Sequence, residues 1–591
     1  MVNHNSMNRL DILRCIRQSH PDWQRINGSN FLDGWMIKIK VGNYDFEILM
    51  EIVDWDFLKL PTVCLKEPNF KNFKKLLPLP HLSIYSKEFD NSLFYNLCYA
   101  VTDSLAYDNY DGVGIIEWCY KQTIKVLGDI FINKSFAKQE ALREIVPIWN
   151  QISTVNNLRL ASWFEHNQAS MLIQNLRKLS EINFLEITQQ NQGFYRFISK
   201  DIKDKSFKIF ILEPVFISEF NGFPNGFIAD NPPYAINFQV FLNWIKSFSP
   251  RNYQTLIQTI IDGINATQQS LFLGCLIVNN HTLTFGIEHT ALKNYLSSKK
   301  KVKLKKTVLN SSFTFNDCWV VLTDSINLTP NFVYKRNIEK LLSDNLSDKK
   351  IVLIGCGAIG GYLGLGLARL GAGSGNGELI LIDEDIIKAE NIGRHALGNT
   401  YVRHYKSTSL KFEIQSQLPA LKVTSYEENI INAKMYKLLE DANLIIDATA
   451  KAEVSQRLNE VYFNTSAITS PIIFSWIRGN GECVQALFVD KDVKSACRCC
   501  LNKSGYAIRE QYDALLGFDP IINFSACSDY TPFSVSASQS ASALTIDLIL
   551  DWLAGNVSPR YRTRYTEKWL GNRIESADYL PHSDCHVCQN E

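Results

Sequence analysis

Residues 349–370 read KKIVLIGCGAIGGYLGLGLARL, and this stretch decides the fold of the C-terminal part of the chain. Lys349–Ile354 is an apolar run typical of a buried strand, and Tyr362–Leu370 begins a helix. Between them lie three glycines at the spacing of a phosphate-binding turn, Gly355, Gly357 and Gly360. Because glycine carries no side chain, backbone amides and the positive end of the helix can approach a phosphate there. The stretch predicts a nucleotide-binding turn, with glycines that serve only helix–strand packing as the alternative.

The sequence that follows continues as short apolar strands separated by helical stretches. The strands are expected at Glu378–Asp383, Asn443–Asp447 and Ile472–Trp476. This alternation predicts a doubly wound, Rossmann-like sheet. Asp383 ends the second strand 23 residues after Gly360, where a carboxylate can accept hydrogen bonds from a ribose. These features alone suit a dehydrogenase and an adenylate-forming enzyme almost equally.

Three polar residues after Asp383 favour the adenylate-forming enzyme. Asn391 and Arg394 follow Asp383 at eight and eleven residues, and Lys406 lies twelve residues further on. Hydride transfer needs no such cluster, whereas cleavage of ATP between its α- and β-phosphates places negative charge on the α-phosphate oxygens and on pyrophosphate. Each residue alone is typical of a protein surface. Together they predict two cations, Arg394 and Lys406, and a neutral donor, Asn391.

Length and composition limit the classes of function. A chain of 591 residues, 46% of them hydrophobic, is long enough for about three or four globular domains. It carries 61 Lys and Arg against 60 Asp and Glu, so its formal charge of +1 provides no field that attracts nucleic acid or an anionic membrane. We find no signal peptide and no apolar run of about 18 residues. We expect a cytoplasmic protein with no membrane partner and no direct contact with nucleic acid.

Two pairs of cysteines have the Cys-x-x-Cys spacing at which two thiolates reach one zinc ion. They are Cys497 with Cys500 and Cys585 with Cys588. Two such pairs complete one closed tetrahedral site, so the sequence predicts a structural zinc that ties the terminal tail to the preceding crossover region. Cys499 and His586 lie inside these pairs as alternative ligands, and disulfide bonds are a further alternative.

Another cysteine, Cys527, lies in the segment Ser525–Pro532, shortly before a helix expected at Ser536–Leu553. A thiol in a loop near a helix N-terminus can have a lowered pKa and attack an acyl adenylate to form a thioester. A buried structural thiol is the alternative.

From about Arg336 to Glu591 the sequence resembles the ubiquitin-activating-enzyme superfamily, including the ThiF/MoeB-like bacterial activators of sulfur-carrier proteins. The resemblance rests on the glycine turn, the polar residues and the cysteines: Gly355–Gly361, Asp383, Asn391, Arg394, Lys406, Asp447, Cys497, Cys500, Cys527, Cys585 and Cys588. It implies that this domain uses ATP and Mg²⁺ to adenylate the C-terminal carboxylate of a small protein, and that Cys527 then accepts the acyl group. It also implies a homodimer in which Arg336 reaches the nucleotide of the partner subunit.

One position departs from the pattern of that superfamily. Its usual Asp-x-x-Asp after the fourth strand reads Asp447-Ala448-Thr449-Ala450 in this chain. The second acid, which the resemblance implies for Mg²⁺, is absent at Ala450. We therefore expect Asp447 to act in its place.

The N-terminal region has a helix at Met7–Ser19, strands at Phe31–Lys40 and Tyr44–Val53, and a long helix at Asp111–Ile132. A Pro-rich stretch containing His81, followed by Cys98, lies between the strands and the long helix. This order resembles the bacterial branch of the ubiquitin-conjugating enzymes. The resemblance implies that Cys98 carries a thioester and that His81 takes the first place of the His-Pro-Asn motif, whose oxyanion-stabilising Asn has no counterpart that we find. A buried core thiol is the alternative for Cys98.

The resulting prediction is a multidomain α/β protein: an α+β conjugating-enzyme-like domain at residues 1–145, an α/β middle domain at 146–330, and a doubly wound adenylation domain with structural zinc at 331–591. This organisation resembles the fused activating–conjugating ligases of bacterial antiphage CBASS operons. It implies transfer of a partner protein's C-terminus, that of a cGAS-like CD-NTase, from ATP to Cys527, then to Cys98, then to an amine of a target protein. An activator of a sulfur-carrier protein and a dehydrogenase-like nucleotide-binding scaffold are the two alternatives.

Overall fold

The computed structural model of the chain forms two compact units, one of residues 1–163 and 169–327 and one of residues 164–168 and 328–591. The structure describes residues 9–27, 31–69, 73, 79–100, 107–153, 158–165, 168–175, 195–196, 206–220, 222–224, 235–267, 271–279, 281–289, 318–327, 333–334, 344–418, 421–503, 507–525, 528–567, 569 and 571–589. The division into three domains stays a prediction.

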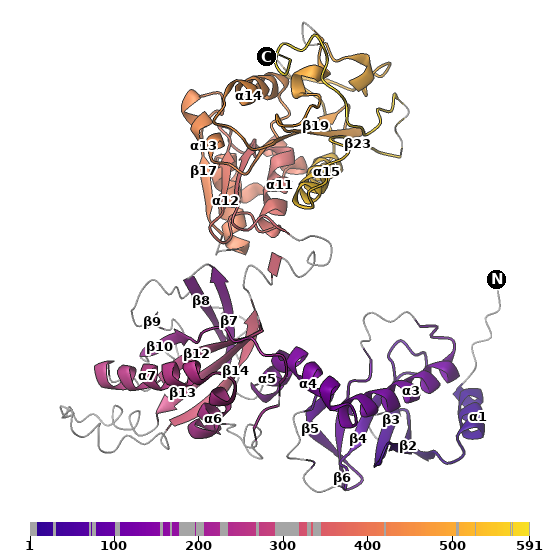
Figure 1. Ribbon diagram of the computed structural model, residues 1–591. Coiled ribbons are helices and arrows are strands. Elements are labelled where there is room, and N and C mark those ends of the chain that lie inside the picture. Colours follow the sequence, from indigo (N-terminus) through magenta and orange to yellow (C-terminus); the bar gives the residue numbers. More distant parts are fainter. Residues whose placement is uncertain are drawn as a thin grey trace. The chain divides into compact units, whose positions relative to one another are not determined.

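The second unit is built on one seven-stranded sheet (Figure 1). Its spatial order is β17 (Val423–Tyr426), β16 (Glu378–Ile382), β15 (Lys350–Ile354), β18 (Leu444–Asp447), β19 (Ile472–Arg478), β20 (Cys483–Val489) and β23 (Tyr561–Tyr565). The first five strands are parallel, β20 runs antiparallel to β19, and β23 pairs antiparallel with β20. The chain order reverses at β15, so the predicted doubly wound sheet is confirmed.

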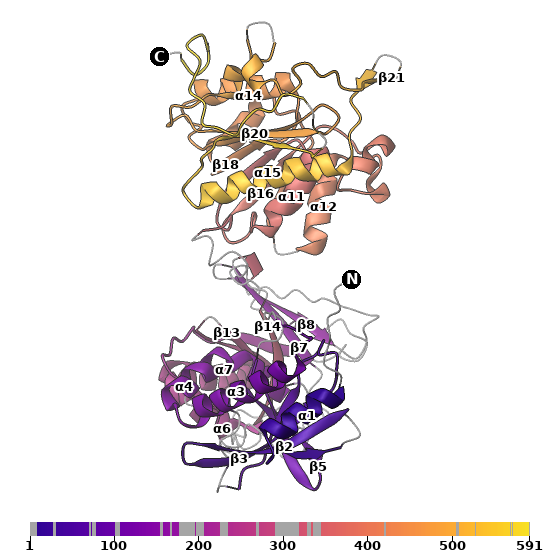
Figure 2. The ribbon, with the colours of Figure 1, turned by 90° about the vertical axis from the view of Figure 1, so that its right-hand side faces the viewer.

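Helices cover both faces of this sheet (Figure 2). One face packs against α11 (Ala358–Arg369), α12 (Lys406–Gln417) and α15 (Val535–Leu553), and the other against α13 (Lys437–Glu440) and α14 (Ala452–Asn464). Along β15 the buried side chains alternate between the two cores, because successive strand residues point to opposite faces. The remaining elements are short: η4 (Ala389–Arg394), η5 (Asn399–Tyr401), η6 (Ala433–Tyr436), η7 (Arg498–Leu501), η8 (Glu510–Tyr512), β21 (Asn523–Ser525) and β22 (Ser528–Tyr530).

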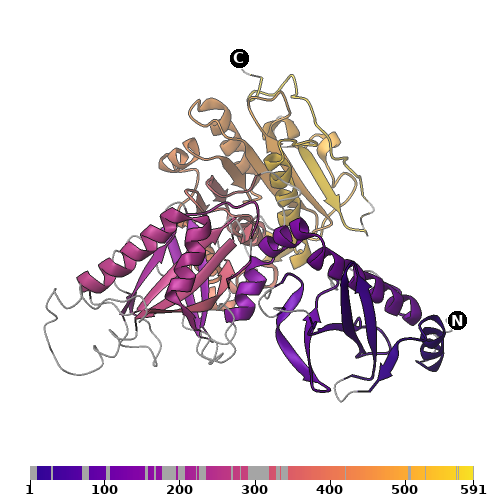
Figure 3. The ribbon, with the colours of Figure 1, turned by 60° about the horizontal axis from the view of Figure 1, so that its bottom comes forward.

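The first unit begins with an antiparallel sheet packed against helices (Figures 1 and 3). The strands lie in the order β1 (Gln24–Ile26), β2 (Asp33–Val41), β3 (Tyr44–Ile52), β4 (Thr62–Lys66), β6 (Ser92–Leu97) and β5 (Leu82–Phe89), and α1 (Arg9–Ser19) and α3 (Gly112–Phe131) share their core. Helix α3 begins after Asp111, whose carboxylate accepts a hydrogen bond of 2.9 Å from Gly114 N. The strands expected at Phe31–Lys40 and Tyr44–Val53 lie within two residues of β2 and β3.

A second sheet follows in the same unit. Its order is β8 (Gln168–Asn175), β7 (Leu158–Glu165), β14 (Cys318–Asn327), β13 (His281–His289), β12 (Leu271–Val278), β10 (Ser206–Ile211) and β9 (Tyr195–Arg196), with β11 (Ala235–Asn237) beside β14. The helices α4 (Lys134–Arg143), α5 (Ile145–Ser153), α6 (Phe238–Phe248) and α7 (Pro250–Thr267) contribute to its core. Trp149 of α5 is fully buried there and donates a 3.0 Å hydrogen bond to Thr284 O.

None of the helices in the described part of the chain combines the length and the apolar character needed to cross a membrane.

Candidate functional site

A cavity of about 650 Å³ opens in the second unit at the carboxyl ends of the central parallel strands. Gly355 follows β15, Asp383 follows β16, and Ala448 follows β18, and all three line it. This is the point where the chain order of the sheet reverses. Helix α11 leaves β15 on one face and α14 leaves β18 on the other, so the connections separate and leave a crevice.

Glycine serves a different purpose at each of the three predicted positions. Gly355 has φ +85°, and a Cβ atom there would lie 2.7 Å from Thr449 N. A Cβ atom at Gly360 would lie 1.8 Å from the carbonyl oxygen of Gly355. Gly357 lines the cavity, and a Cβ atom there would meet nothing within 4 Å. Two glycines therefore allow close backbone packing, and the third keeps the cavity open beside the N-terminus of α11.

Asp383 connects the glycine turn to the loop that follows β16. Its carboxylate accepts hydrogen bonds of 2.6 Å from Cys356 N and 2.8 Å from Asp385 N. Burial raises the pKa of this carboxyl, although the nearby Lys406 ammonium opposes the shift. Each carboxylate oxygen still has acceptor capacity, so Asp383 can accept further hydrogen bonds from hydroxyl groups of a ligand.

The two predicted cations both line the cavity. Lys406, the first residue of α12, is held 3.0 Å from Asp385 Oδ2. Burial alone would raise the pKa of the Asp385 carboxyl. The hydrogen bond and charge of the Lys406 ammonium outweigh this and keep that pKa below its usual value. The Arg394 guanidinium lies over the Phe533 ring, 5.0 Å from its centroid. Within the described residues no carboxylate lies within salt-bridge distance of Arg394, so its charge is available to a ligand.

His395, next to Arg394, connects this segment to the glycine turn by a hydrogen bond. Its Nε2 donates to Cys356 O at 2.8 Å, and its Nδ1 accepts from Leu397 N at 3.0 Å. Burial lowers the pKa of His395 to about 4, so the ring is neutral at pH 7. Asn391 also lines the cavity, and its Oδ1 accepts from Lys388 N at 3.0 Å. The Asn391 side-chain amide group remains a candidate donor.

Asp447 does not line the cavity. It is fully buried at the end of β18, where it accepts hydrogen bonds from Thr449 N at 2.9 Å, from Thr449 Oγ1 at 2.6 Å and from Ser455 Oγ. Burial raises its pKa. Ala450, at the position of the missing acid, has φ +55°, which non-glycine residues adopt uncommonly. The expected role of Asp447 toward Mg²⁺ stays a prediction. The acids that do line the cavity are Asp383, Glu384, Asp385 and Glu428.

The sequence interpretation missed several residues of the cavity wall. They are Thr449, Lys451, Arg478 and Phe533. Arg478 ends β19, and its position just beyond the predicted strand Ile472–Trp476 was a usable indication, because carboxyl ends of parallel strands share one edge. Phe533 lies just before α15, at the end of the long segment after β20, and no local pattern marks it.

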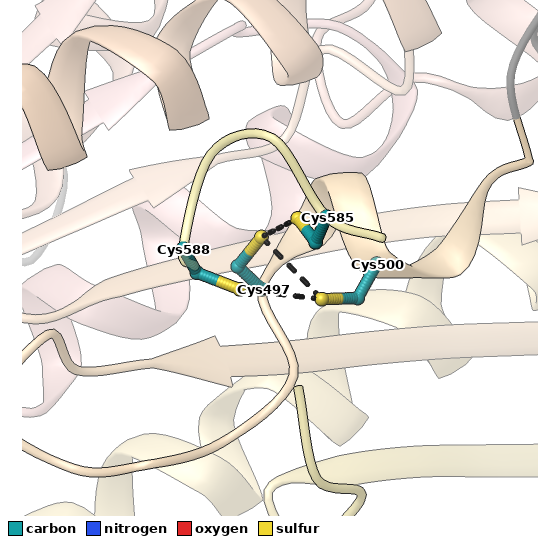
Figure 4. Close-up of side chains that lie close together, drawn as sticks. All are labelled: Cys497, Cys500, Cys585 and Cys588. Atoms are coloured by element: carbon teal, nitrogen blue, oxygen red, sulfur yellow. Dashed lines mark hydrogen bonds between the residues drawn. The ribbon is translucent and has the colours of Figure 1, made fainter. Parts of the chain in front are cut away.

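The four cysteines of the two Cys-x-x-Cys pairs form one cluster (Figure 4). Their sulfurs all lie within 4.8 Å of one another. Individual Sγ–Sγ distances are 3.8 Å for Cys497–Cys500, 3.7 Å for Cys497–Cys585 and 3.4 Å for Cys500–Cys588, and no disulfide joins them. A tetrahedral zinc with Zn–S bonds of about 2.3 Å requires sulfur separations of about 3.8 Å. The cluster therefore fits a zinc ion.

A buried amide supports this cluster from α14. Asn459 Nδ2 donates to Cys497 Sγ at 3.4 Å and to Cys499 Sγ at 3.3 Å. Donors of this kind orient thiolate ligands and offset their negative charge. Cys499 and His586, the alternative ligands, lie outside the set of four converging sulfurs.

The remaining predicted residues lie apart from the cavity or outside the described residues. Cys98 and His81 are in the first unit, where Cys98 is exposed and its backbone N donates a 2.7 Å hydrogen bond to His81 O. Cys527 and Arg336 lie outside the described residues.

Comparison with known proteins identifies the domain that contains the cavity. Residues 333–561 match the ThiF family. We refer to this segment as the ThiF-family domain after that match. The match spans the glycine turn, Asp383, Arg394 and Lys406.

Relatives that carry the name ATP-dependent ubiquitin transferase-like protein Cap2 include one from Pseudomonas aeruginosa and one from Escherichia coli. The protein of Pseudomonas aeruginosa (strain BWHPSA011 / Pa011) is 26% identical over 62% of this chain and 64% of its own length. The protein of Escherichia coli (strain TW11681) is 34% identical over 43% of this chain and 44% of its own length. The chain thus spans about half the length of these relatives, and the matches confirm the resemblance to fused activating enzymes of the CBASS type.

Among solved structures, E. coli MccB with ATP aligns at 20% identity and a TM-score of 0.33. The alignment covers 43% of this chain and 73% of MccB.

The glycines of the ThiF-family domain provide a matched pair of substitutions. Gly360→Ala should lower the free energy of unfolding by about 1–3 kcal/mol, because the new methyl group overlaps Gly355 O. Gly357→Ala should change stability by less than about 1 kcal/mol but weaken binding of ATP, because its methyl group enters the cavity. Urea unfolding and equilibrium binding measure the two effects. Equal stability of both variants would contradict the packing argument.

We expect one zinc per chain, and Cys585→Ser should reduce zinc content and stability together, because a structural metal is coupled to folding. Cys499→Ser is the matched control, since Cys499 lies in the same segment but outside the four-sulfur set. Elemental analysis with thermal unfolding measures both. Full zinc content in Cys585→Ser, or equal loss in the control, would refute the assignment.

Proposed function

We propose that the ThiF-family domain uses ATP and Mg²⁺ to adenylate the C-terminal carboxylate of a partner protein. The supporting observation is the convergence of Gly357, Arg394 and Lys406 on one cavity. In the reaction a carboxylate oxygen attacks the α-phosphorus, the bond from that phosphorus to the oxygen bridging to the β-phosphate breaks, and pyrophosphate leaves. Negative charge then grows on phosphate oxygens, which the two cations and the N-terminus of α11 can stabilise.

The other cavity residues position the nucleotide. Asp383 accepts hydrogen bonds from the ribose, and Asn391 donates to a phosphate. The acids that remain for Mg²⁺ at the cavity wall are Glu384, Asp385 and Glu428, whereas the oxygens of Asp447 already accept three hydrogen bonds. Oxygen ligands of this kind suit Mg²⁺, which also keeps several waters and phosphate oxygens.

The acyl group then moves to two cysteines in turn. Cys527 is the first acceptor, and Tyr530, three positions later in the chain, lines the cavity. Cys98 is the second, in a domain of ubiquitin-conjugating type at residues 1–145. Its exposed thiol at the end of β6, beside His81, supports this assignment. A thioester retains enough energy for attack by an amine of a target protein, and tethering both thiols in one assembly favours the transfer.

The partner is proposed to be a cGAS-like CD-NTase, and the assembly a homodimer in which Arg336 serves the neighbouring nucleotide site. The names of the two Cap2 relatives support a ubiquitin-transferase-like reaction. The role in antiphage defence is proposed from the resemblance to CBASS ligases. The cysteine cluster is proposed to hold a structural zinc, and residues 146–330 to set the geometry of transfer. The alternative, activation of a sulfur-carrier protein, gives no role to the exposed Cys98.

The first half-reaction should depend on the cations and not on the cysteines. With ATP, pyrophosphate and a cGAS-like protein of the same genome, Lys406→Ala should lower isotope exchange by roughly 10²–10³, the usual effect of losing one transition-state charge contact. Cys527→Ala should retain exchange, as should Lys411→Ala on the same helix. Equal losses in Lys406→Ala and Cys527→Ala would contradict the assigned roles.

The order of the thioesters is tested with the same partner. Cys98→Ala should accumulate a reductant-sensitive adduct on Cys527 and form no target conjugate, because the second acceptor is missing. Cys527→Ala should form no adduct on either sulfur. Denaturing gels with and without reductant measure both. Isopeptide-linked product at the wild-type rate in Cys98→Ala would disprove the relay.

A further inference from the structure

His81 and Cys98 face each other at the ends of two paired strands. Strands β5 and β6 are antiparallel, and Leu82 pairs with Leu97, so His81 and Cys98 occupy the next facing positions. The 2.7 Å hydrogen bond from Cys98 N to His81 O continues this pairing. Facing residues of an antiparallel pair project to the same side of the sheet, with Cβ atoms about 4.5–5.5 Å apart. The hydrogen bond between the His81 ring and the Cys98 sulfur places the imidazole beside the thiol.

Two carboxylates lie near the two ring nitrogens of this imidazole. Glu144 Oε1 lies 2.9 Å from His81 Nδ1, and Glu144 Oε2 accepts a 2.8 Å hydrogen bond from His81 N. Glu140 Oε1 lies 3.6 Å from His81 Nε2. His81 has φ +60°, a conformation that a non-glycine residue holds only where its surroundings enforce it. Glu144 contacts both the backbone N–H and the ring of His81.

These contacts fix the charge of the ring. A hydrogen bond with the Cys98 sulfur is the largest influence and the bond to Glu144 the next, and together they raise the pKa of His81 to about 10 despite burial. The carboxyl of Glu144 is itself half-buried, and the bond to His81 keeps its pKa low although burial opposes this. Glu144 and Glu140 stay beside the ring when Cys98 carries an acyl group, so these two carboxylates continue to favour the imidazolium, which can stabilise an anion.

We propose that the His81 imidazolium stabilises the oxyanion formed at the Cys98 thioester, and that Glu144 is its positioning residue, with Glu140 in support. The inference rests on the proposed function of Cys98. When an amine attacks the thioester carbonyl, the C–N bond forms and the carbonyl oxygen becomes an oxyanion. Collapse of this intermediate breaks the C–S bond and releases the Cys98 thiolate, while the extra proton of the amine passes to solvent.

Glu140 and Glu144 lie on or beside helices that pack in the core of the second sheet. Glu140 lies on α4, and Glu144 separates α4 from α5. Their neighbours Ala141, Ile145 and Trp149 are buried in the core of that sheet. The only other charged group beside these acids in the described residues is the largely exposed Arg143, 3.0 Å from Glu140 Oε2. The second sheet thus anchors the groups that hold His81 at Cys98.

Two small probes test the proposal on the full-length protein without any partner. Acetyl transfer from phenyl thioacetate to Cys98 passes through an oxyanion, whereas alkylation of Cys98 by iodoacetamide does not. Peptide mass spectrometry gives both rates at this one cysteine. The ratio of acylation to alkylation should fall about tenfold or more in His81→Gln and Glu144→Gln, on the scale of a lost oxyanion contact.

Glu117→Gln is the matched control, because it removes a similar pair, His20 Nε2 to Glu117 Oε1 at 2.6 Å, elsewhere in the same unit. Its ratio should equal that of the wild type. Glu140→Gln leaves both Glu144 bonds in place and should lower the ratio by a smaller factor, which keeps the test valid if Glu144→Gln is unstable.

An unchanged ratio in His81→Gln, or equal slowing of both reactions in Glu144→Gln, would overturn the proposal, since a purely structural role slows both alike. These readouts need neither ATP nor a partner. A failure of the relay from Cys527 therefore remains distinguishable from a failure of this inference.

Discussion

Close backbone contact at the end of β15 is the constraint on which the ThiF-family domain depends. Gly355 packs against the backbone of Thr449, and Gly360 packs against Gly355 itself, with no room for a side chain at either position. This contact brings the connection after β15 to the connection after β18, while their helices pass to opposite faces of the sheet. A crevice must remain between them, and Gly357 leaves it open to a ligand.

The charged groups around the cavity are positioned by the segments that this backbone contact brings together. Asp383 can remain beside the turn because two backbone amides and the Lys406 ammonium offset the cost of burying it. His395 bonds to Cys356 O as a neutral ring and so adds no charge to the cavity. Of the two cations, Lys406 is paired with Asp385, whereas Arg394 has no carboxylate at salt-bridge distance among the described residues. Such an arrangement suits a reaction that places negative charge on phosphate oxygens.

Local patterns predicted the central strands, the glycine turn and the two cations, because each is encoded within one strand–turn–helix segment. Strand β17 was missed, since it is a four-residue edge strand with a single buried residue. The inward position of Asp447 was also missed, because it depends on Ser455 one helical turn into α14. Glu144 acts on His81 across 63 residues, a contact that only the packing of two sheets creates. The assignments of Cys527 and Arg336 remain predictions.

The central claim is that this cavity binds ATP with its α-phosphate between two cations. The most direct measurement is a crystal structure of the full-length protein with Mg²⁺ and a non-hydrolysable ATP analogue. The account predicts an α-phosphate oxygen within hydrogen-bonding distance of Lys406 Nζ and the Arg394 guanidinium, with the ribose hydroxyls on Asp383. A nucleotide whose phosphates lie away from both cations, or one bound outside this cavity, would contradict it.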